Sequence, residues 1–326
     1  MSLRKLGSTG LSIAPLGLGS VNFSWLTDEK DSFAILDAAF ERGVNLLDTS
    51  DNYNAGQSEA LIGRWFAQGG GRREKTVLAT KVYSAPMEWG SPDPVKRTGS
   101  WVGPNQKGLS AKHIREACEA SLKRLNTDYL DLYQMHHVDR GTRWEEIWQA
   151  MEVLVAQGKV LYVGSSNFAG WHIAQAQESA RRRDFLGLAS EQSVYNLMKR
   201  TVELEVLPAC AAYGMAFLPY SPLAAGALGG KPKENEPGRR SYVKQTEALD
   251  AYAALCGRIG REPADVALAW LAHRPGVTAP IVGPRTLAQF EANLAAVETR
   301  LDDDTVTELD QIFPGPGGVA PEAYAW

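Results

Sequence analysis

Residues 130–136 read Leu-Asp-Leu-Tyr-Gln-Met-His, and residues 160–165 read Val-Leu-Tyr-Val-Gly-Ser. Both stretches are short and rich in Leu, Val and Tyr, a pattern typical of buried strands. Between them, residues 144–157 follow a helical pattern that ends before Gly158, a residue suited to the C-terminus of a helix. Two strands that begin about 30 residues apart, with a helix between them, predict a β-α-β unit with parallel strands.

The same alternation extends along the whole chain. The candidate strands are residues 16–20, 45–48, 77–81, 130–136, 160–165, 188–192, 216–220 and 279–282, and the helical patterns are residues 31–42, 110–125, 144–157, 171–182, 202–213, 249–258 and 263–273. A doubly wound open sheet would also alternate, but Gly17 and Gly19 lack the third glycine of its dinucleotide fingerprint. Eight units favour a (β/α)8 TIM barrel, preceded by a hairpin of residues 3–6 and 11–14, in one domain over residues 1–326.

The composition excludes several classes of protein. The 326 residues are 44% hydrophobic and 22% charged, with a net charge of −4, which is ordinary for a globular protein. The absence of a basic stripe argues against nucleic acid as a partner. The sequence contains no run of about 18 apolar residues, so no membrane span is predicted. The first residues lack the apolar core of a signal peptide, so we expect a cytoplasmic protein. Three widely spaced cysteines predict neither disulfides nor a metal site.

Polar side chains gather where the predicted strands end. Asp48 ends the second strand, Lys81 the third and His136 the fourth, while Tyr53 follows shortly after Asp48. The carboxyl ends of barrel strands share one face, where active sites lie. We therefore expect these four side chains to meet.

Together, the four residue types suit the reduction of a carbonyl group. Hydride must come from a cofactor, because no side chain donates it. A phenol can supply the proton, although its ordinary pKa is about 10, and a neighbouring ammonium lowers that value. A carboxylate holds the ammonium in place, and an imidazole can hydrogen-bond the substrate oxygen.

The chain resembles the aldo-keto reductases over nearly its whole length. The resemblance is carried by residues 47–53, 80–81, 128–136 and 158–167. It implies that Tyr53 is the general acid, that Asp48 and Lys81 assist it, and that a histidine orients the carbonyl. His136 and His137 are neighbours that point to opposite sides of a strand, and alternation alone does not choose between them. The family pattern selects His136, two residues after a Gln.

The resemblance also implies a nicotinamide cofactor. Ser166, Asn167 and Gln192 would bind its carboxamide, and Tyr220 would stack on its ring. The remaining cofactor contacts would be Ser221, Leu223, Gly226, Gly283, Arg285, Gln289 and Asn293. Arg285 could bind a 2′-phosphate, which favours NADP(H) over NAD(H). Many relatives carry Arg where this chain has Gln289 and an acidic residue where it has Ala292, and these departures weaken that preference.

Two long segments, residues 83–109 and 221–247, follow strands and are expected to wall a cleft. We expect a small carbonyl substrate to contact Trp25, Trp89, Trp101 and His137. One alternative substrate is a nucleotide-linked keto-deoxysugar, whose phosphates could meet Lys96, Arg97, Arg239 and Arg240. A non-enzymatic alternative is a redox-sensing cytoplasmic subunit of a potassium channel, since relatives of this fold serve as such subunits. The oligomeric state stays open.

Overall fold

In the computed structural model, which describes residues 1–89, 91–100, 102–230 and 246–323, eight parallel strands stand side by side in chain order. They are β3 (Gly17–Gly19), β4 (Leu46–Asp48), β5 (Val77–Val82), β6 (Leu130–Met135), β7 (Val160–Ser166), β8 (Leu188–Gln192), β9 (Ala216–Phe217) and β10 (Ile281–Val282). The last strand, β10, pairs with the first, β3. A parallel bridge between Tyr220 and Ile281 joins the segment after β9 to β10, and the amide of Ile281 donates to the carbonyl of Pro219. The strands therefore form the predicted (β/α)8 barrel.

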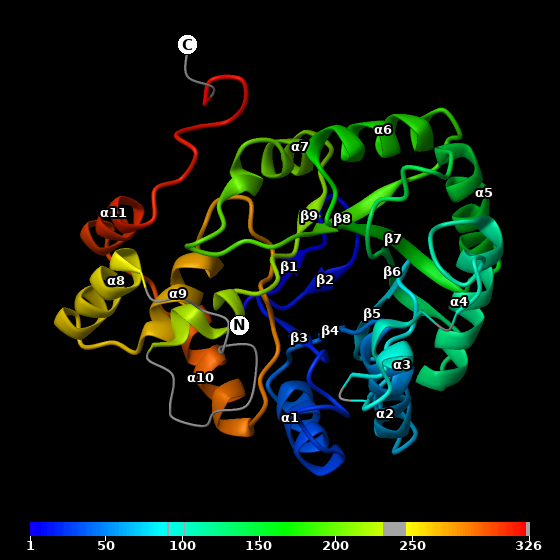
Figure 1. Ribbon diagram of the computed structural model, residues 1–326, viewed down its shortest axis with the longest axis horizontal. Coiled ribbons are helices and arrows are strands. Elements are labelled where there is room, and N and C mark those ends of the chain that lie inside the picture. Colours follow the sequence, from blue (N-terminus) through cyan, green and yellow to red (C-terminus); the bar gives the residue numbers. More distant parts are fainter. Residues whose placement is uncertain (90, 101, 231–245, 324–326) are drawn as a thin grey trace.

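Helices surround the strands on the outside, as Figure 1 shows. They are α1 (Glu29–Glu41), α2 (Gln57–Phe66), α3 (Pro94–Thr98), α4 (Ala111–Leu125), α5 (Trp144–Ala156), α6 (Gly170–Arg181), α7 (Val206–Ala212), α8 (Glu247–Arg258), α9 (Pro263–Ala272), α10 (Leu287–Glu298) and α11 (Asp303–Ile312), with the 3₁₀ turns η1 (Tyr53–Gly56), η2 (Thr201–Glu203) and η3 (Ala224–Gly229). Among the described residues, no helix is both long and apolar enough to span a bilayer.

The buried apolar side chains divide into two clusters. One lies between strands and helices and includes Leu47, Leu78 and Tyr133. The other joins side chains of alternate strand residues, such as Leu46 and Leu132, with residues of the N-terminal hairpin. Because successive side chains of a strand point to opposite sides, this second cluster is the interior of the barrel.

The predicted N-terminal hairpin is present and forms the floor of the barrel. Its strands are β1 (Arg4–Lys5) and β2 (Ser12–Ile13), which pair antiparallel. Leu6 and Ile13 are fully buried against the interior cluster. The end of the barrel opposite the strand carboxyl ends is thus closed by apolar packing.

Several predicted elements differ in extent from those observed. The strand predicted at residues 216–220 ends at Phe217, and the one predicted at 279–282 begins at Ile281. Pro219 and Pro280 have no amide proton for the ladder, which explains both differences. The helix predicted at 202–213 is divided into η2 and α7, with Glu205 outside helical geometry. The helices α2, α3, α10 and α11 were not predicted.

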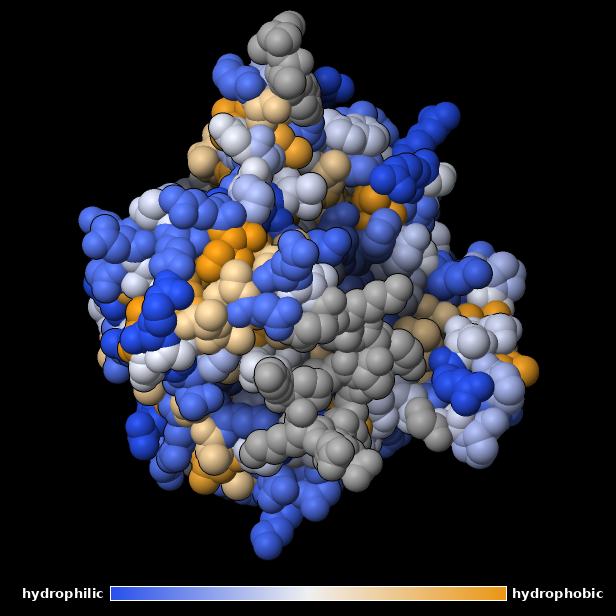
Figure 2. All heavy atoms as spheres, turned by 60° about the vertical axis from the view of Figure 1, so that its left-hand side comes forward, coloured by the Kyte–Doolittle hydropathy of each residue, from blue (hydrophilic) through white to orange (hydrophobic). Residues whose placement is uncertain are grey.

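The surface is mainly hydrophilic on the face that Figure 2 shows, with hydrophobic side chains in small separate groups. The large apolar residues are instead concentrated in the two buried clusters. Among the coloured residues of this face, no broad apolar surface is seen.

Candidate active site

Strand alternation brings the predicted polar residues into the barrel mouth. In β6, Leu132 belongs to the interior cluster, whereas Tyr133 belongs to the outer one. Gln134 and His136 have the same parity as Leu132, and His136 lines a cleft at the mouth. Lys81 is the register partner of Gln134 in the neighbouring strand β5.

The ammonium of Lys81 is the centre of the site. It lies 2.5 Å from Oδ2 of Asp48, 2.9 Å from the carbonyl oxygen of Thr49 and 3.1 Å from the hydroxyl of Tyr53. Lys81 is fully buried, and burial by itself would lower its pKa, but the charge of Asp48 and the contact with Tyr53 outweigh burial and raise it. The lysine thus stays charged beside the phenol.

Two amides hold the other oxygen of Asp48. Oδ1 accepts hydrogen bonds from Nε2 of Gln134 at 3.0 Å and from Nε2 of Gln192 at 2.8 Å. These bonds stabilise the carboxylate and fix its orientation toward Lys81. Gln134 was part of a recognised motif, but no role had been predicted for it. Its strand parity with His136 was the signal that could have revealed it.

Tyr53 stands on a strained turn. The two residues after it, Asn54 and Ala55, have left-handed φ angles of 47° and 53°. Nδ2 of Asn54 donates to the carbonyl of Ser24 at 2.7 Å, which ties this turn to the loop after β3. Non-glycine residues hold such angles only where their surroundings enforce them. The turn therefore fixes the position of the Tyr53 hydroxyl above Lys81.

His136 is a half-buried, neutral imidazole. Burial, together with the charges of Lys81 and His137, lowers its pKa to about 3. Its Nδ1 lies 3.1 Å from the hydroxyl oxygen of Ser50, and its ring centre lies 6.0 Å from that of Tyr53. The two side chains are therefore placed to act on one group in the cleft.

The cleft has a volume of about 870 Å³ and extends from these residues to the start of α10. Near His136 it is lined by the predicted residues Ser166, Asn167, Gln192 and Tyr220. The amide of Asn167 donates to the carbonyl oxygen of His136 at 3.1 Å and accepts from the hydroxyl of Tyr220 at 2.8 Å. The predicted carboxamide-binding residues and the predicted catalytic residues thus meet at one end of the cleft.

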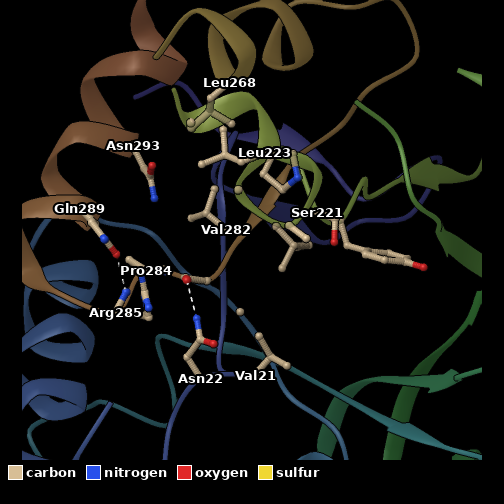
Figure 3. A pocket seen from close by; sticks show the side chains of 18 of the residues that line it. Val21, Asn22, Ser221, Leu223, Leu268, Val282, Pro284, Arg285, Gln289 and Asn293 are labelled. Atoms are coloured by element: carbon tan, nitrogen blue, oxygen red, sulfur yellow. Dashed lines mark hydrogen bonds between the residues drawn. The ribbon is translucent and has the colours of Figure 1, made fainter. Parts of the chain in front are cut away.

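The predicted contacts for the rest of the cofactor line the other end. They are Ser221, Leu223, Gly226, Gly283, Arg285, Gln289 and Asn293. Figure 3 shows Gln289 and Asn293 projecting from one helix toward the cleft, with Leu223 and Ser221 on the opposite wall. Oε1 of Gln289 accepts from the amide of Arg285 at 2.8 Å. Three residues that line the cleft were not predicted from the sequence. They are Asn22, whose side chain donates to the carbonyl of Gly283, and the acidic residues Glu262 and Asp265.

The residues predicted to contact substrate are only partly brought together. Trp89 lines the cleft, and its ring centre lies 5.7 Å from that of Tyr53. Trp25 packs on Trp89 at 5.2 Å but is not among the lining residues, and neither is His137, whose ring lies against Tyr83. Trp101 lies outside the described residues.

The proposed phosphate patch of the alternative substrate is also only partly described. Lys96 pairs with Glu88 at 3.6 Å, and Arg97 donates to the carbonyl of Ser91. Arg239 and Arg240 lie outside the described residues. Within the described part of the chain, no group of three His, Cys, Asp or Glu side chains is arranged to hold a metal ion.

Comparison with known proteins matches the chain to one family. The sequence model of the Aldo/keto reductase family matches residues 15–313. An uncharacterized oxidoreductase, YrpG of Bacillus subtilis, is 48% identical and covers 100% of both chains. Versiconal hemiacetal acetate reductase of Aspergillus parasiticus is 31% identical over 96% of this chain and 97% of its own. A probable voltage-gated potassium channel subunit beta of Arabidopsis thaliana is 32% identical over 99% of this chain and 100% of its own.

Proposed function

The chain belongs to the aldo/keto reductase family, and from this premise we propose that it reduces an aldehyde or ketone to the alcohol with NADPH, Tyr53 acting as the general acid. The family and its oxidoreductase members support carbonyl reduction. The observation that carries the proposal is the Lys81 ammonium, which bonds both the Asp48 carboxylate and the Tyr53 hydroxyl at the mouth of the barrel.

The donor chemistry of the cleft fits a nicotinamide dinucleotide. Ser166 and Asn167 offer a hydroxyl and an amide at the end near His136, and Arg285 offers a cation at the other end. Between them, Ser221 and Gly226 have left-handed φ angles of 54° and 97°, a backbone form that can turn amide groups toward an anion. When bound, the cofactor supplies the hydride that no side chain can give.

The side chains of this chain then have separate tasks. Tyr53 donates the proton to the carbonyl oxygen, and Lys81 stabilises the phenolate that remains. Asp48, held by its two amide partners, keeps the lysine in place. His136, which is neutral, can hydrogen-bond the carbonyl oxygen without adding a positive charge.

The assignment of NADPH rests on Arg285, because a guanidinium binds a 2′-phosphate by a charged fork. Glu262 and Asp265, which line the same cleft, would oppose a phosphate placed beside them. The wild-type assay run with NADPH and with NADH decides between the two cofactors.

The first test is Tyr53→Phe, which removes the proton donor but keeps the ring. We expect its rate of NADPH oxidation, measured over a panel of aldehydes and ketones, to fall by about 100-fold or more. The variant should still bind NADPH, which a fluorescence titration measures. Tyr213→Phe is the matched control, since this hydroxyl lies on the outer helix layer and contacts Glu178. Full activity in Tyr53→Phe would show that another group gives the proton.

The alternatives are tested by the same assay. A nucleotide-linked keto-deoxysugar belongs in the substrate panel, because only part of its proposed phosphate patch is described. One relative is a probable voltage-gated potassium channel subunit beta. The channel-subunit alternative is nevertheless not favoured, since the complete set of Asp48, Tyr53, Lys81 and His136 is assembled around the cleft.

A further inference from the structure

Ser50 is a fully buried hydroxyl next to His136 to which no role has yet been given. Its Oγ lies 3.1 Å from Nδ1 of His136. Because the ring is neutral, only one of its two nitrogens carries a proton, and the partner of Nδ1 decides which one. The contact with Ser50 therefore bears on the state of Nε2.

Which nitrogen of His136 carries the ring proton depends on the acceptor to which Ser50 donates its single hydroxyl proton. Three acceptors lie within reach, namely Nδ1 of His136, Oδ1 of Asn52 at 2.8 Å and Oδ1 of Asp51 at 3.3 Å. If the proton goes to Asn52, Nδ1 must carry the ring proton and Nε2 becomes an acceptor. A carbonyl oxygen is itself an acceptor, so this form of the ring could not hold it.

Two features allow donation to His136 instead. With the amide oxygen of Asn52 toward Ser50 the hydroxyl donates to it, whereas with the amide turned over, which has the same shape, the nitrogen donates to Oγ and leaves the hydroxyl proton for the ring. Burial, and then the charge of Glu59, raises the pKa of Asp51 well above its ordinary value. This favours the uncharged carboxyl group, which is a weaker acceptor.

We propose that Ser50, oriented by Asn52, donates its hydroxyl proton to Nδ1 of His136 and so keeps the ring proton on Nε2, the nitrogen available to a carbonyl oxygen. Ser50 is thus a positioning residue that acts through His136. The catalytic use of this arrangement rests on the proposed function, whereas the tautomer is a property of the chain alone.

The first experiment measures the tautomer by long-range ¹H–¹⁵N NMR of the full chain with ¹⁵N-labelled histidine. The chain has five histidines, and the signal of His136 is assigned from its loss in His136→Asn. We expect a protonated Nε2 and an unprotonated Nδ1 that accepts a hydrogen bond. In Ser50→Ala the Nδ1 signal should move toward that of a nitrogen without a donor, and in Ser50→Thr it should return. A protonated Nδ1 in the wild type, or an Nδ1 signal that Ser50→Ala leaves unchanged, would overturn the proposal.

The second experiment compares kinetics in the same variants. We expect Ser50→Ala to lower kcat about tenfold or more, with the affinity for NADPH unchanged, and Ser50→Thr to recover most of the loss. Ser58→Ala is the control for loss of a buried hydroxyl, because Ser58 bonds Ser20 and not the ring. An equal loss of kcat in both alanine variants would show a merely structural effect and contradict the proposal. If the wild type reduces no carbonyl, the proposed function fails, and the NMR measurement still decides the tautomer.

Discussion

At the scale of single residues, the neutral state of His136 has a measurable consequence. Its pKa is lowered to about 3 by burial, Lys81 and His137, so the ring does not gain a proton between about pH 5 and pH 8, where histidines ordinarily titrate. We expect the profile of kcat/KM over this range to show no break near pH 6.5. A break there that disappears in His136→Asn would contradict the neutral assignment.

The same shift links His136 to stability. The unfolded chain binds a proton at this histidine near its ordinary pKa of about 6.5, while the folded chain does so only near 3. The free energy of unfolding should therefore fall as the pH drops from about 6.5 toward 3. In urea titrations, His136→Asn should show a smaller fall over that window than the wild type does.

The choice between His136 and His137 illustrates how far sequence reasoning reaches at this scale. Alternation along β6 says that the two side chains point to opposite sides, but not which side is the interior. The register of Lys81 with Gln134 settles it, because this pairing sets Gln134 and His136 on the side of the buried ion pair. That register is a property of two strands together.

At the scale of elements, the turn after β7 depends on a buried carboxyl group. Glu191 accepts hydrogen bonds from Ser165, from Ser193 at 2.5 Å and from the amide of Phe168 at 3.1 Å. These bonds lie beneath Asn167, whose left-handed φ of 61° aims its amide into the cleft. Glu191 thus anchors the segment that presents Ser166 and Asn167.

Glu191→Ala should loosen this segment and weaken the binding of NADPH. Three donors would lose their acceptor, so we expect the dissociation constant, measured by fluorescence titration, to rise by about tenfold. Glu178→Ala, an exposed carboxylate on α6, is the control. An unchanged affinity in Glu191→Ala would mean that the turn keeps its shape without the carboxyl group.

Glu191 also affects how the free energy of unfolding depends on pH, and its effect is opposite in sign to that of His136. Burial raises the pKa of this carboxyl group to about 7, although its hydrogen bonds act in the other direction. The folded chain therefore holds this proton above the ordinary pKa of about 4.5, and the contribution to stability is lost as the pH rises from 4.5 to 7. In urea titrations, the free energy of unfolding of Glu191→Gln should not show this fall between pH 4.5 and 7.

The N-termini of two helices show which element boundaries could be predicted from local sequence. The helix α4 follows the N-cap Ser110, whose hydroxyl accepts from the amide of His113, and the predicted helical pattern begins at this residue. The helix α2 begins instead after Gly56 in a left-handed conformation without a side-chain cap, and it is preceded by the strained η1 turn. No sequence pattern predicts this N-terminus of α2, because the turn before it is imposed by contacts with the loop after β3.

At the scale of the whole molecule, the candidate site and the N-terminal hairpin lie at opposite ends of the barrel. The mouth collects polar side chains from β4, β5, β6 and β8, whereas the opposite end is closed by the apolar hairpin. A change in the hairpin should therefore alter stability without altering the chemistry. Gly7 and Gly10, two glycines of the same turn, allow this separation to be tested.

Gly7→Ala should destabilise the barrel. Gly7 has a φ of +59°, and a Cβ atom there would lie 2.4 Å from the backbone oxygen of Gly214, whereas one at Gly10 would meet no atom within 4 Å. We expect Gly7→Ala to lower the free energy of unfolding by about 1–3 kcal/mol, because both the strained angle and the backbone clash act against it. Gly10→Ala should stay within about 0.5 kcal/mol of the wild type. Urea unfolding measures both values, and the affinity for NADPH of the folded protein should be the same in all three chains. Equal unfolding midpoints for the two variants would show that the hairpin is not held against the barrel as tightly as its contact with Gly214 requires.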